Sequence, residues 1–333
     1  MLTIICPIYN EEKYIAHCLE SILRQDYPKE DMEVLFVDGM STDRTREIVM
    51  QYADNYPMIR LIDNPQRIVP PAMNIGVKAS SGDIIVRIDA HAIFPPNYVS
   101  ELVRYLLNLK ADNVGGICRT LPIRDTIVCR SIANVLSSRF GMGNSYYRIG
   151  AKDIMKVDTV PFGCFHRELF DKIGFFDEDL TRNQDDEFNG RIIKNGGKIY
   201  LLPHLVIDYY ARDTISKVYK MFYQYGLFKP LVNKKLGNPA TLRQFFPLAY
   251  VSGLIVGPLC FMLSPWFVVI YIAVLVLYFC AATIFSLNDT RNVKHIVVQD
   301  WVFFVVHFAY GWGYINGFWK LLTHTPFTVK SNR

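Results

Sequence analysis

Acidic side chains occur where apolar runs of this sequence end, and these residues could do chemistry. In the segment GDIIVRIDAH, residues 82–91, four apolar residues lead into Asp89-Ala90-His91. Alternate residues of an extended chain point the same way, so Asp89 and His91 are expected on one face. A carboxylate and an imidazole there can hold a divalent cation, Mg²⁺ or Mn²⁺. Two solvated polar residues at a strand end would give the same pattern, so the context must decide.

Three more acidic positions follow predicted strands or loops. They are Glu11, Asp38 and the run Asp185-Asp186-Glu187. The carboxyl ends of parallel strands share one edge of a sheet, where open α/β sheets bind their ligands. Glu11, Asp38 and Asp89 should therefore meet. Each acid alone is typical of a surface, and only their convergence favours a shared site.

These residues could bind a nucleotide and accept a proton. A carboxylate at Asp38 can accept hydrogen bonds from a pyrimidine N–H or from ribose hydroxyls, and Asn74 and Arg67 could complete that pocket. Neighbouring carboxylates raise one another's pKa, which suits Asp185 or Asp186 to accept a proton. Acids also stabilise the first turn of a helix, so a structural role for this run stays open.

The elements that must position these residues alternate along the chain. Strands are predicted at 2–7, 33–37, 59–63 and 84–89, and helices at 11–24, 41–52 and 71–79. The alternation predicts an α/β fold with a mostly parallel sheet flanked by helices. No glycine precedes Gly39, which excludes the glycine-rich phosphate loop of dinucleotide-binding domains. A nucleotide here must be held by side chains and a metal.

The next part of the chain is less regular. A helix is predicted at 98–109, a strand at 114–119, and helices at 167–173 and 188–194. Between them, residues 121–157 show weak periodicity and several glycines. Long irregular segments inside a domain are often functional, so we expect this one to shape the pocket for a second substrate.

The C-terminal part is strongly apolar. Residues 245–287 contain no Asp, Glu, Lys, Arg or His, which suits two membrane passes hinged near Ser264-Pro265. Residues 301–319 form a third apolar segment with aromatic edges. The first pass is interrupted by Gly257-Pro258 and could instead be re-entrant. Three full passes would put Lys330 and Arg333 on the far side of the membrane, against the charge rule, so the topology stays open.

Charge and cysteine content narrow the class of protein. The net charge of +5 is too small to indicate nucleic acid, but Thr214 to Gln244 holds five lysines and Arg243 without an acid. Such a block beside an apolar segment suits the cytoplasmic face of a membrane. The seven cysteines never form a C-x-x-C pair, which favours a reducing compartment. The N-terminus lacks the pattern of a signal peptide.

Five segments in order resemble the family 2 glycosyltransferases of the GT-A fold. They are PIYNEE at 7–12, VDGMSTD at 37–43, NIGVKASSGDIIVRIDAH at 74–91, VPFGCFHRELFDKIGFFDE at 160–178 and NQDDEFNGRI at 183–192. The membrane-attached bacterial exopolysaccharide enzymes of the succinoglycan glucosyltransferase type are the most similar. The resemblance implies an α/β GT-A catalytic domain at 1–212, a basic amphipathic interfacial region at 213–244, a membrane domain of two to three helices at 245–322 and a tail at 323–333.

The resemblance also assigns roles to individual residues. It implies that Pro7, Tyr9 and Glu11 line the nucleotide pocket, that Asp38 contacts the base, and that Asp89 lies at the diphosphate and metal. The family more often has D-x-D, so His91 as a metal ligand is a departure.

Two further family motifs are incomplete in this chain. The E-D acid motif falls on Gln184-Asp185, which singles out Asp185 as the base with Asp186 second. Processive members carry Q-x-x-R-W before the membrane; here Gln224 is present, the arginine is missing, and Lys229 could replace it as the partner of the diphosphate. On the helix that carries Gln224, Ile215, Val218, Phe222 and Tyr225 share one face, as in a helix lying on a membrane surface.

The function implied is an inverting, metal-dependent transferase. It would move a sugar from a nucleotide-sugar donor, a UDP-sugar, to a polyprenyl-linked saccharide in exopolysaccharide, capsule or cell-surface glycan synthesis. The enzyme would be a multi-pass protein of the cell membrane with a cytoplasmic catalytic domain. A processive polysaccharide synthase and a non-catalytic nucleotide-sugar-binding membrane subunit are the alternatives. The sugar, the linkage and the oligomeric state are not predicted.

Overall fold

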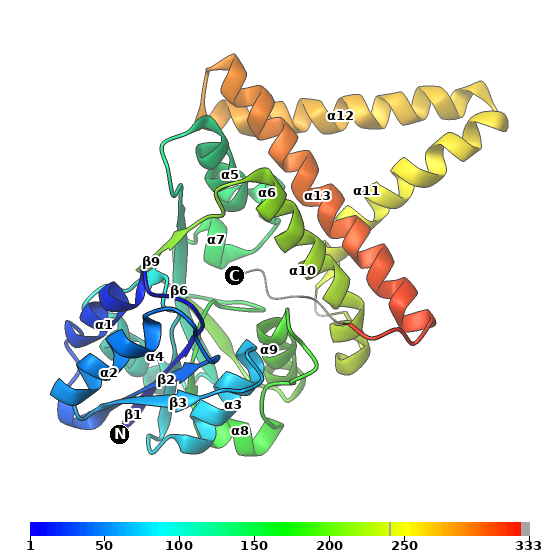
Figure 1. Ribbon diagram of the computed structural model, residues 1–333. Helices are drawn as coiled ribbons and strands as arrows, with labels where there is room; N and C mark the ends of the chain where they lie inside the picture. Colours follow the sequence, from blue (N-terminus) through cyan, green and yellow to red (C-terminus); the bar gives the residue numbers. More distant parts are fainter. Residues whose placement is uncertain (240, 328–333) are drawn as a thin grey trace. The chain divides into compact units, whose positions relative to one another are not determined.

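The computed structural model describes residues 1–239 and 241–327 (Figure 1). The described chain divides into two compact units. The first comprises Met1–Arg119 and Gly150–Tyr209, and the second comprises Thr120–Ile149 and residues 210–327. Of the predicted tail at 323–333, residues 328–333 lie outside the described residues, and Lys330 and Arg333 with them.

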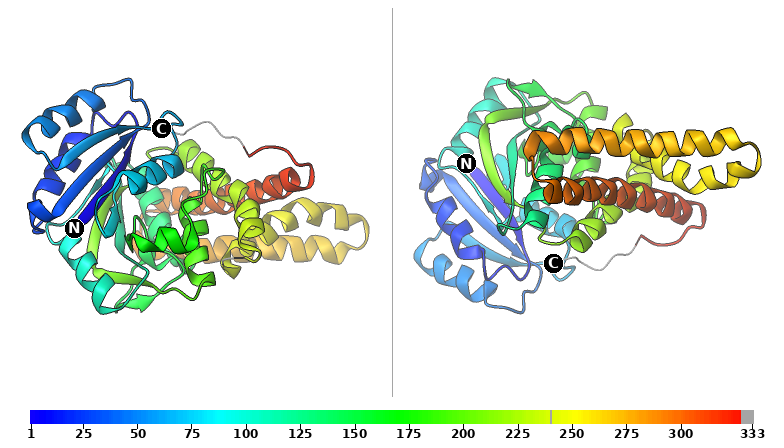
Figure 2. Two further views of the ribbon diagram at one scale, coloured as in Figure 1. Left: turned by 90° about the horizontal axis from the view of Figure 1, so that it is seen from below. Right: turned by 90° about the horizontal axis from the view of Figure 1, so that it is seen from above.

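A mixed sheet forms the centre of the first unit (Figure 2). Its strand order is β3(Ile59–Asp63), β2(Met32–Asp38), β1(Leu2–Ile8), β4(Ile84–Arg87), β8(Cys164–His166), β6(Asn113–Leu121), β9(Ile199–Tyr210) and β5(Ala92–Ile93), and β7(Met155–Lys156) pairs with β9. The first four strands are parallel, as predicted. The sheet continues with antiparallel pairings, such as β8 on β4. Of these later strands, β6 was predicted, at 114–119, whereas β5, β7, β8 and β9 were not.

Helices connect and cover these strands. They are α1(Ile15–Leu23), α2(Thr45–Asn55), α3(Val69–Ala79), α4(Tyr98–Asn108), α8(Glu168–Ile173) and α9(Gln184–Lys194), with a 3-10 turn η1(Lys29–Asp31). The predicted helix at 41–52 starts later than expected, at Thr45. The reason is that Ser41 donates to the Asp38 carboxylate, while Asp43 accepts from the main-chain N–H of Thr45 at 3.0 Å. The segment between β2 and α2 is therefore a hydrogen-bonded loop.

Most of the segment predicted to be irregular, 121–157, is helical and belongs to the second unit, whereas its last residues, with β7, belong to the first. The helical part forms α5(Ile127–Ser137), α6(Arg139–Met142) and α7(Tyr146–Ile149). Thr126 and Ser138 cap α5 and α6 by accepting from main-chain N–H groups. Helices as short as α6 and α7 cannot show a full apolar stripe, which explains the weak periodicity.

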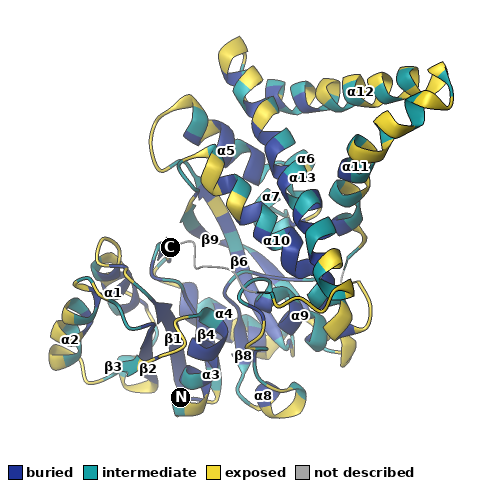
Figure 3. Cartoon of the chain, turned by 45° about the vertical axis from the view of Figure 1, so that its right-hand side comes forward, coloured by how far each residue is buried: buried dark blue, intermediate teal, exposed yellow. Residues whose placement is uncertain are grey.

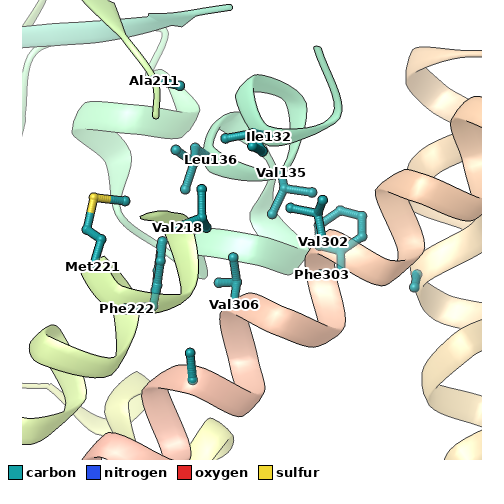
Figure 4. Packing of buried hydrophobic residues seen from close by; sticks show 12 residues of the cluster. Ile132, Val135, Leu136, Ala211, Val218, Met221, Phe222, Val302, Phe303 and Val306 are labelled. Carbon is teal, nitrogen blue, oxygen red and sulfur yellow. The ribbon is translucent and has the colours of Figure 1, made fainter. Parts of the chain in front are cut away.

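The predicted interfacial helix is also a packed element. It is α10(Ile215–Leu236), and it carries Val218 and Phe222 fully or nearly fully buried in an apolar cluster with α5 and α13(Val293–Leu322) (Figure 4). Ile215 and Tyr225 pack against the same cluster. The apolar face assigned to a membrane surface is therefore covered by protein. The prediction that these residues form one apolar face was correct, but the prediction that this face rests on a membrane surface was wrong.

Three helical segments of the described chain are long and apolar enough to cross a membrane. They are Leu242–Met262, Pro265–Asp289 and Val293–Leu322. The first consists of η2(Leu242–Gln244), α11(Phe245–Val256) and η3(Gly257–Met262), and the second is α12(Pro265–Asp289). Ser264 caps α12 at the predicted hinge. In each of the first two segments, only 6% of the most apolar 18-residue stretch is buried, against 50% in α13. Figure 3 shows the exposed residues along α11 and α12.

Glycines allow α10 and α13 to pack closely. A Cβ atom at Gly313 would lie 2.1 Å from the carbonyl oxygen of Tyr223, and one at Gly226 would lie 2.0 Å from that of Tyr310. Carbon atoms do not approach main-chain oxygens so closely, so a side chain at either position forces the helices apart. Small residues have this role in many helix pairs.

Replacing Gly313 by alanine should therefore destabilise the second unit. We expect a loss of about 1–3 kcal/mol from overpacking, seen as a lower thermal unfolding midpoint of the detergent-solubilised protein. The matched control is Gly253→Ala in α11, where a Cβ meets no atom within 4 Å. The control should be neutral or slightly stabilising because alanine favours helix. Equal midpoints for the two variants would contradict the close packing.

Candidate active site

Three parallel strands deliver polar residues to one edge of the sheet. Ile8 of β1 lies opposite Asp38 of β2, and Ile5 lies opposite Arg87 of β4. Pro7 is buried in β1, and Tyr9 and Glu11 follow it. Figure 3 shows β1, β2 and β4 as neighbouring, buried strands. These strands thus end at one edge of the sheet. That Glu11, Asp38 and Asp89 share a site there stays a prediction.

Asp38 is fully buried and held by several donors. Its carboxylate accepts from the main-chain N–H and hydroxyl of Ser41 and from Arg46 at 2.6 Å. Arg46 also binds Asp63, at the end of β3, at 2.8 Å. No local pattern pointed to Arg46 as a site residue. This network fixes the loop between β2 and α2 beside Tyr9.

The geometry of Asp89 and His91 differs from the prediction. β4 ends at Arg87, and the main-chain N–H of Ala92 donates to the carbonyl of Asp89 at 3.2 Å, so a turn replaces the last part of the expected strand. Asp89 and His91 therefore do not lie on one face of a strand, and this part of the prediction was wrong. The ring of His91 lies 3.6 Å from the carboxylate of Glu11, whose own main-chain N–H donates to Thr45.

A buried arginine joins Asp89 to the predicted base. The side chain of Arg87 is only 6% exposed; it donates to Asp185 and lies 3.4 Å from Asp89. Burial lowers the pKa of Arg87, but the charges of Asp185 and Asp89 outweigh it and the pKa rises. Arg87 was not among the predicted site residues. Its signal is a positive charge inside the run IIVRID, in which the other charged residue is Asp89.

Asp185 lies in the first turn of α9, as the position of the acid run suggested. Burial raises the pKa of its carboxyl group and Arg87 opposes the rise, while Asp89 and Asp186 add to it, so the balance is a raised pKa. The side chain still has 40% of its surface exposed, so solvent limits the effect of burial. A partly exposed carboxyl with a raised pKa can accept a proton from a bound hydroxyl.

Packing fixes the position of α9. Phe188 stacks on Phe176 with ring centroids 4.3 Å apart, and Asn189 donates to Thr159 at 2.8 Å. Arg191 donates to the carbonyls of Ile173 and Phe175 at 2.6 and 2.7 Å. The helix that carries Asp185 is therefore anchored through three of its side chains.

The remaining predicted residues are in different surroundings. Asn74 is buried and exchanges two hydrogen bonds of 2.9 Å with the main chain of Phe176. Arg67 is exposed, with a positive φ of 61°, on the loop after β3. Gln224 and Lys229 are buried in α10, in the second unit. None of these contacts tests their predicted roles at the nucleotide.

The donor groups suit a cation that is shared with a substrate. No group of three or more His, Cys, Asp or Glu residues that could hold a metal occurs in the described ranges. Asp89 and His91 could supply one oxygen and one nitrogen. Mg²⁺ commonly takes one or two carboxylates and completes its coordination with water and phosphate oxygens, so the residues present fit such an ion.

Known proteins with similar sequences identify the family. Residues 3–174, just over half of the chain, match the model of "Glycosyl transferase family 2". The chain belongs to this family. A Methanococcus voltae relative is 30% identical over 96% of this chain and 97% of its own length. It is named dolichyl N-acetyl-alpha-D-glucosaminyl phosphate 3-beta-D-2,3-diacetamido-2,3-dideoxy-beta-D-glucuronosyltransferase. The succinoglycan biosynthesis protein ExoA of Rhizobium meliloti is 30% identical over 74% of each chain.

Solved structures agree on the fold. The mannosyltransferase PcManGT of Pyrobaculum calidifontis, in complex with GDP-Man and Mn²⁺, superimposes with a TM-score of 0.64 at 20% identity, over 96% of this chain and 87% of that one. The predicted family and the predicted GT-A fold with apolar C-terminal helices are confirmed. This family 2 chain is a glycosyltransferase.

The contacts of Asn74 generate a prediction. Replacing Asn74 by alanine leaves two main-chain groups of Phe176 without partners, which should cost about 1–3 kcal/mol of stability. Thermal unfolding of the solubilised enzyme measures this, with Asn108→Ala, at an exposed position in α4, as the control. Unchanged stability together with weaker nucleotide binding would instead support the nucleoside role that the sequence suggested.

Proposed function

We propose that this enzyme transfers a sugar from a UDP-sugar to a saccharide on a polyprenyl-type lipid, with inversion at the anomeric carbon. The observation that carries the proposal is the meeting of Asp89 and Asp185 around Arg87 in a family 2 chain. It brings Asp89, the proposed ligand of a cation at the leaving diphosphate, close to Asp185, the proposed base.

The proposed step has a simple balance of bonds. The oxygen of the acceptor hydroxyl attacks the anomeric carbon of the donor sugar, and the bond from that carbon to the diphosphate oxygen breaks. The hydroxyl proton passes to the carboxylate of Asp185, and the nucleoside diphosphate leaves with the electron pair. Attack opposite the leaving group gives inversion. Asp186, in the same turn of α9, is the second candidate for the base.

The donor would lie along the ends of β1, β2 and β4. Pro7, Tyr9, Glu11 and Asp38 are the proposed contacts for the nucleoside, with Arg67 and Asn74 beside them as the sequence suggested. Asp89 and His91 would hold a divalent cation, Mg²⁺ or Mn²⁺, at the diphosphate. When bound, such an ion neutralises the charge that develops on the leaving group. Gln224 and Lys229 remain proposed partners of the diphosphate.

The acceptor proposal rests on the apolar helices and on one relative. Three helices could cross a membrane by length and composition among the described residues, and the Methanococcus voltae relative is named for a dolichyl phosphate acceptor. A lipid carrier would present its saccharide at the surface of the bilayer. The basic segment between Thr214 and Gln244 supports a cytoplasmic catalytic unit on a multi-pass membrane protein. Surface-glycan or exopolysaccharide synthesis is the proposed context.

Replacing Asp185 by asparagine should abolish most of the transfer. An amide cannot accept the proton, so kcat should fall by about 10²–10⁴-fold while nucleotide binding persists. The assay uses detergent-solubilised enzyme, a panel of UDP- and GDP-sugars and a short polyprenyl phosphate carrying N-acetylglucosamine, and it follows release of nucleoside diphosphate. Asp171→Asn, at an exposed position in α8, is the matched control. Turnover of the Asp185 variant within about threefold of wild type would remove Asp185 from the reaction.

Removing divalent cations should stop turnover. Chelation with EDTA is expected to abolish transfer, and added Mn²⁺ or Mg²⁺ should restore it. Asp89→Asn should raise the cation concentration needed for half-maximal activity by at least about tenfold, because one carboxylate ligand is lost. Asp83→Asn, an exposed acid just before β4, should behave as wild type. Full activity in EDTA would contradict a metal role for Asp89 and His91.

A further inference from the structure

Arg87 is a charged residue in a place where charge is costly. It ends a central strand of the sheet, with β1 on one side and β8 on the other, and its side chain is 6% exposed. Removing a guanidinium from water is unfavourable unless carboxylates and hydrogen bonds compensate. The compensation comes from Asp185 and Asp89. An apolar residue could have filled the same space, so the charge calls for a functional explanation.

The two partners of Arg87 come from different parts of the chain. Asp89 follows on the same segment, whereas Asp185 lies 98 residues further on, in α9. One guanidinium nitrogen faces each carboxylate, and Nε has no hydrogen-bond partner among the described residues. The planar fork of arginine can contact both acids at fixed geometry, whereas a lysine ammonium offers a single point charge.

We propose that Arg87 is a positioning residue that orients the Asp185 carboxylate toward the acceptor hydroxyl and ties it to Asp89. This inference rests on the proposed function, since it assigns Arg87 a role through the proposed base. The anchoring of α9 by Phe188, Asn189 and Arg191 sets the helix, and Arg87 sets the carboxylate at its start.

A direct contact between Arg87 and the donor diphosphate is the competing explanation. The geometry favours positioning, because the side chain is almost fully covered and two of its nitrogens already face carboxylates. Nε, the nitrogen without a hydrogen-bond partner among the described residues, is itself buried and offers a phosphate no open approach. The two roles differ in kinetics: a phosphate contact acts on donor affinity, whereas a positioning residue acts on the rate of transfer through Asp185.

A double-mutant cycle tests the proposal. The proteins are wild type, Arg87→Met, Asp185→Asn and the double variant, each assayed with the same donor panel and the same N-acetylglucosamine-bearing polyprenyl phosphate. We expect Arg87→Met to lower kcat by about 10²-fold in the wild-type background, since misplacing a reacting group has an effect of that size. In the Asp185→Asn background the same change should lower kcat by less than about threefold. The donor KM should stay within about threefold of wild type.

A conservative variant, Arg87→Lys, serves as the control for this cycle. Arg87→Lys retains the positive charge, so its kcat should fall by about tenfold or less. If Arg87→Met does not fold, judged by thermal unfolding, Arg87→Lys takes its place in the cycle. Equal losses in both backgrounds, or a donor KM raised tenfold with unchanged kcat, would overturn the positioning role. Wild-type turnover by Asp185→Asn alone would instead show that the proposed base is wrong, so the two failures are distinguishable.

Discussion

One constraint governs the candidate site in the first unit: a guanidinium buried at the end of β4 must find negative partners. Asp89 can reach it from the following turn, but Asp185 can do so only if α9 begins close to the end of this strand. The aromatic packing of Phe188 and the main-chain contacts of Arg191 hold α9 there. Charge compensation therefore links the central strand to a helix that follows it by almost a hundred residues.

Much of the first half of this unit was readable from the sequence. Local patterns define β1 to β4, because each strand is a short, largely apolar run, and three of the four end in a charged residue. Parallel pairing brings their ends to one edge. This is why Glu11, Asp38 and Asp89 could be grouped in advance. The antiparallel pairings of β8 and β9 could not be read, since they depend on contacts between distant segments.

The turn at Asp89 and the contacts of Arg87 were not predicted, for a related reason. A turn at Asp89 replaces the extended geometry on which the Asp89–His91 argument relied, and Arg87 looked like one more strand residue. The role of the buried charge of Arg87 can be recognised only when its partners are known, and one of them, Asp185, lies in α9. Asp185 was selected through the family motif rather than through its own surroundings. In the same way, the apolar face of α10 was recognised, but not the protein surface that covers it.

The chain leaves the sheet-containing unit twice, and this has a consequence for its architecture. Residues 120–149 depart between β6 and β7 and pack with helices from the C-terminal part, where Ile132, Val135 and Leu136 of α5 are buried with Val302 and Val306 of α13. A single cut after β9 would remove α13 and expose that surface of α5 to water. The sheet-containing unit therefore cannot be separated from the apolar C-terminal helices by one cut, and an exchange of those helices would have to carry residues 120–149 with them.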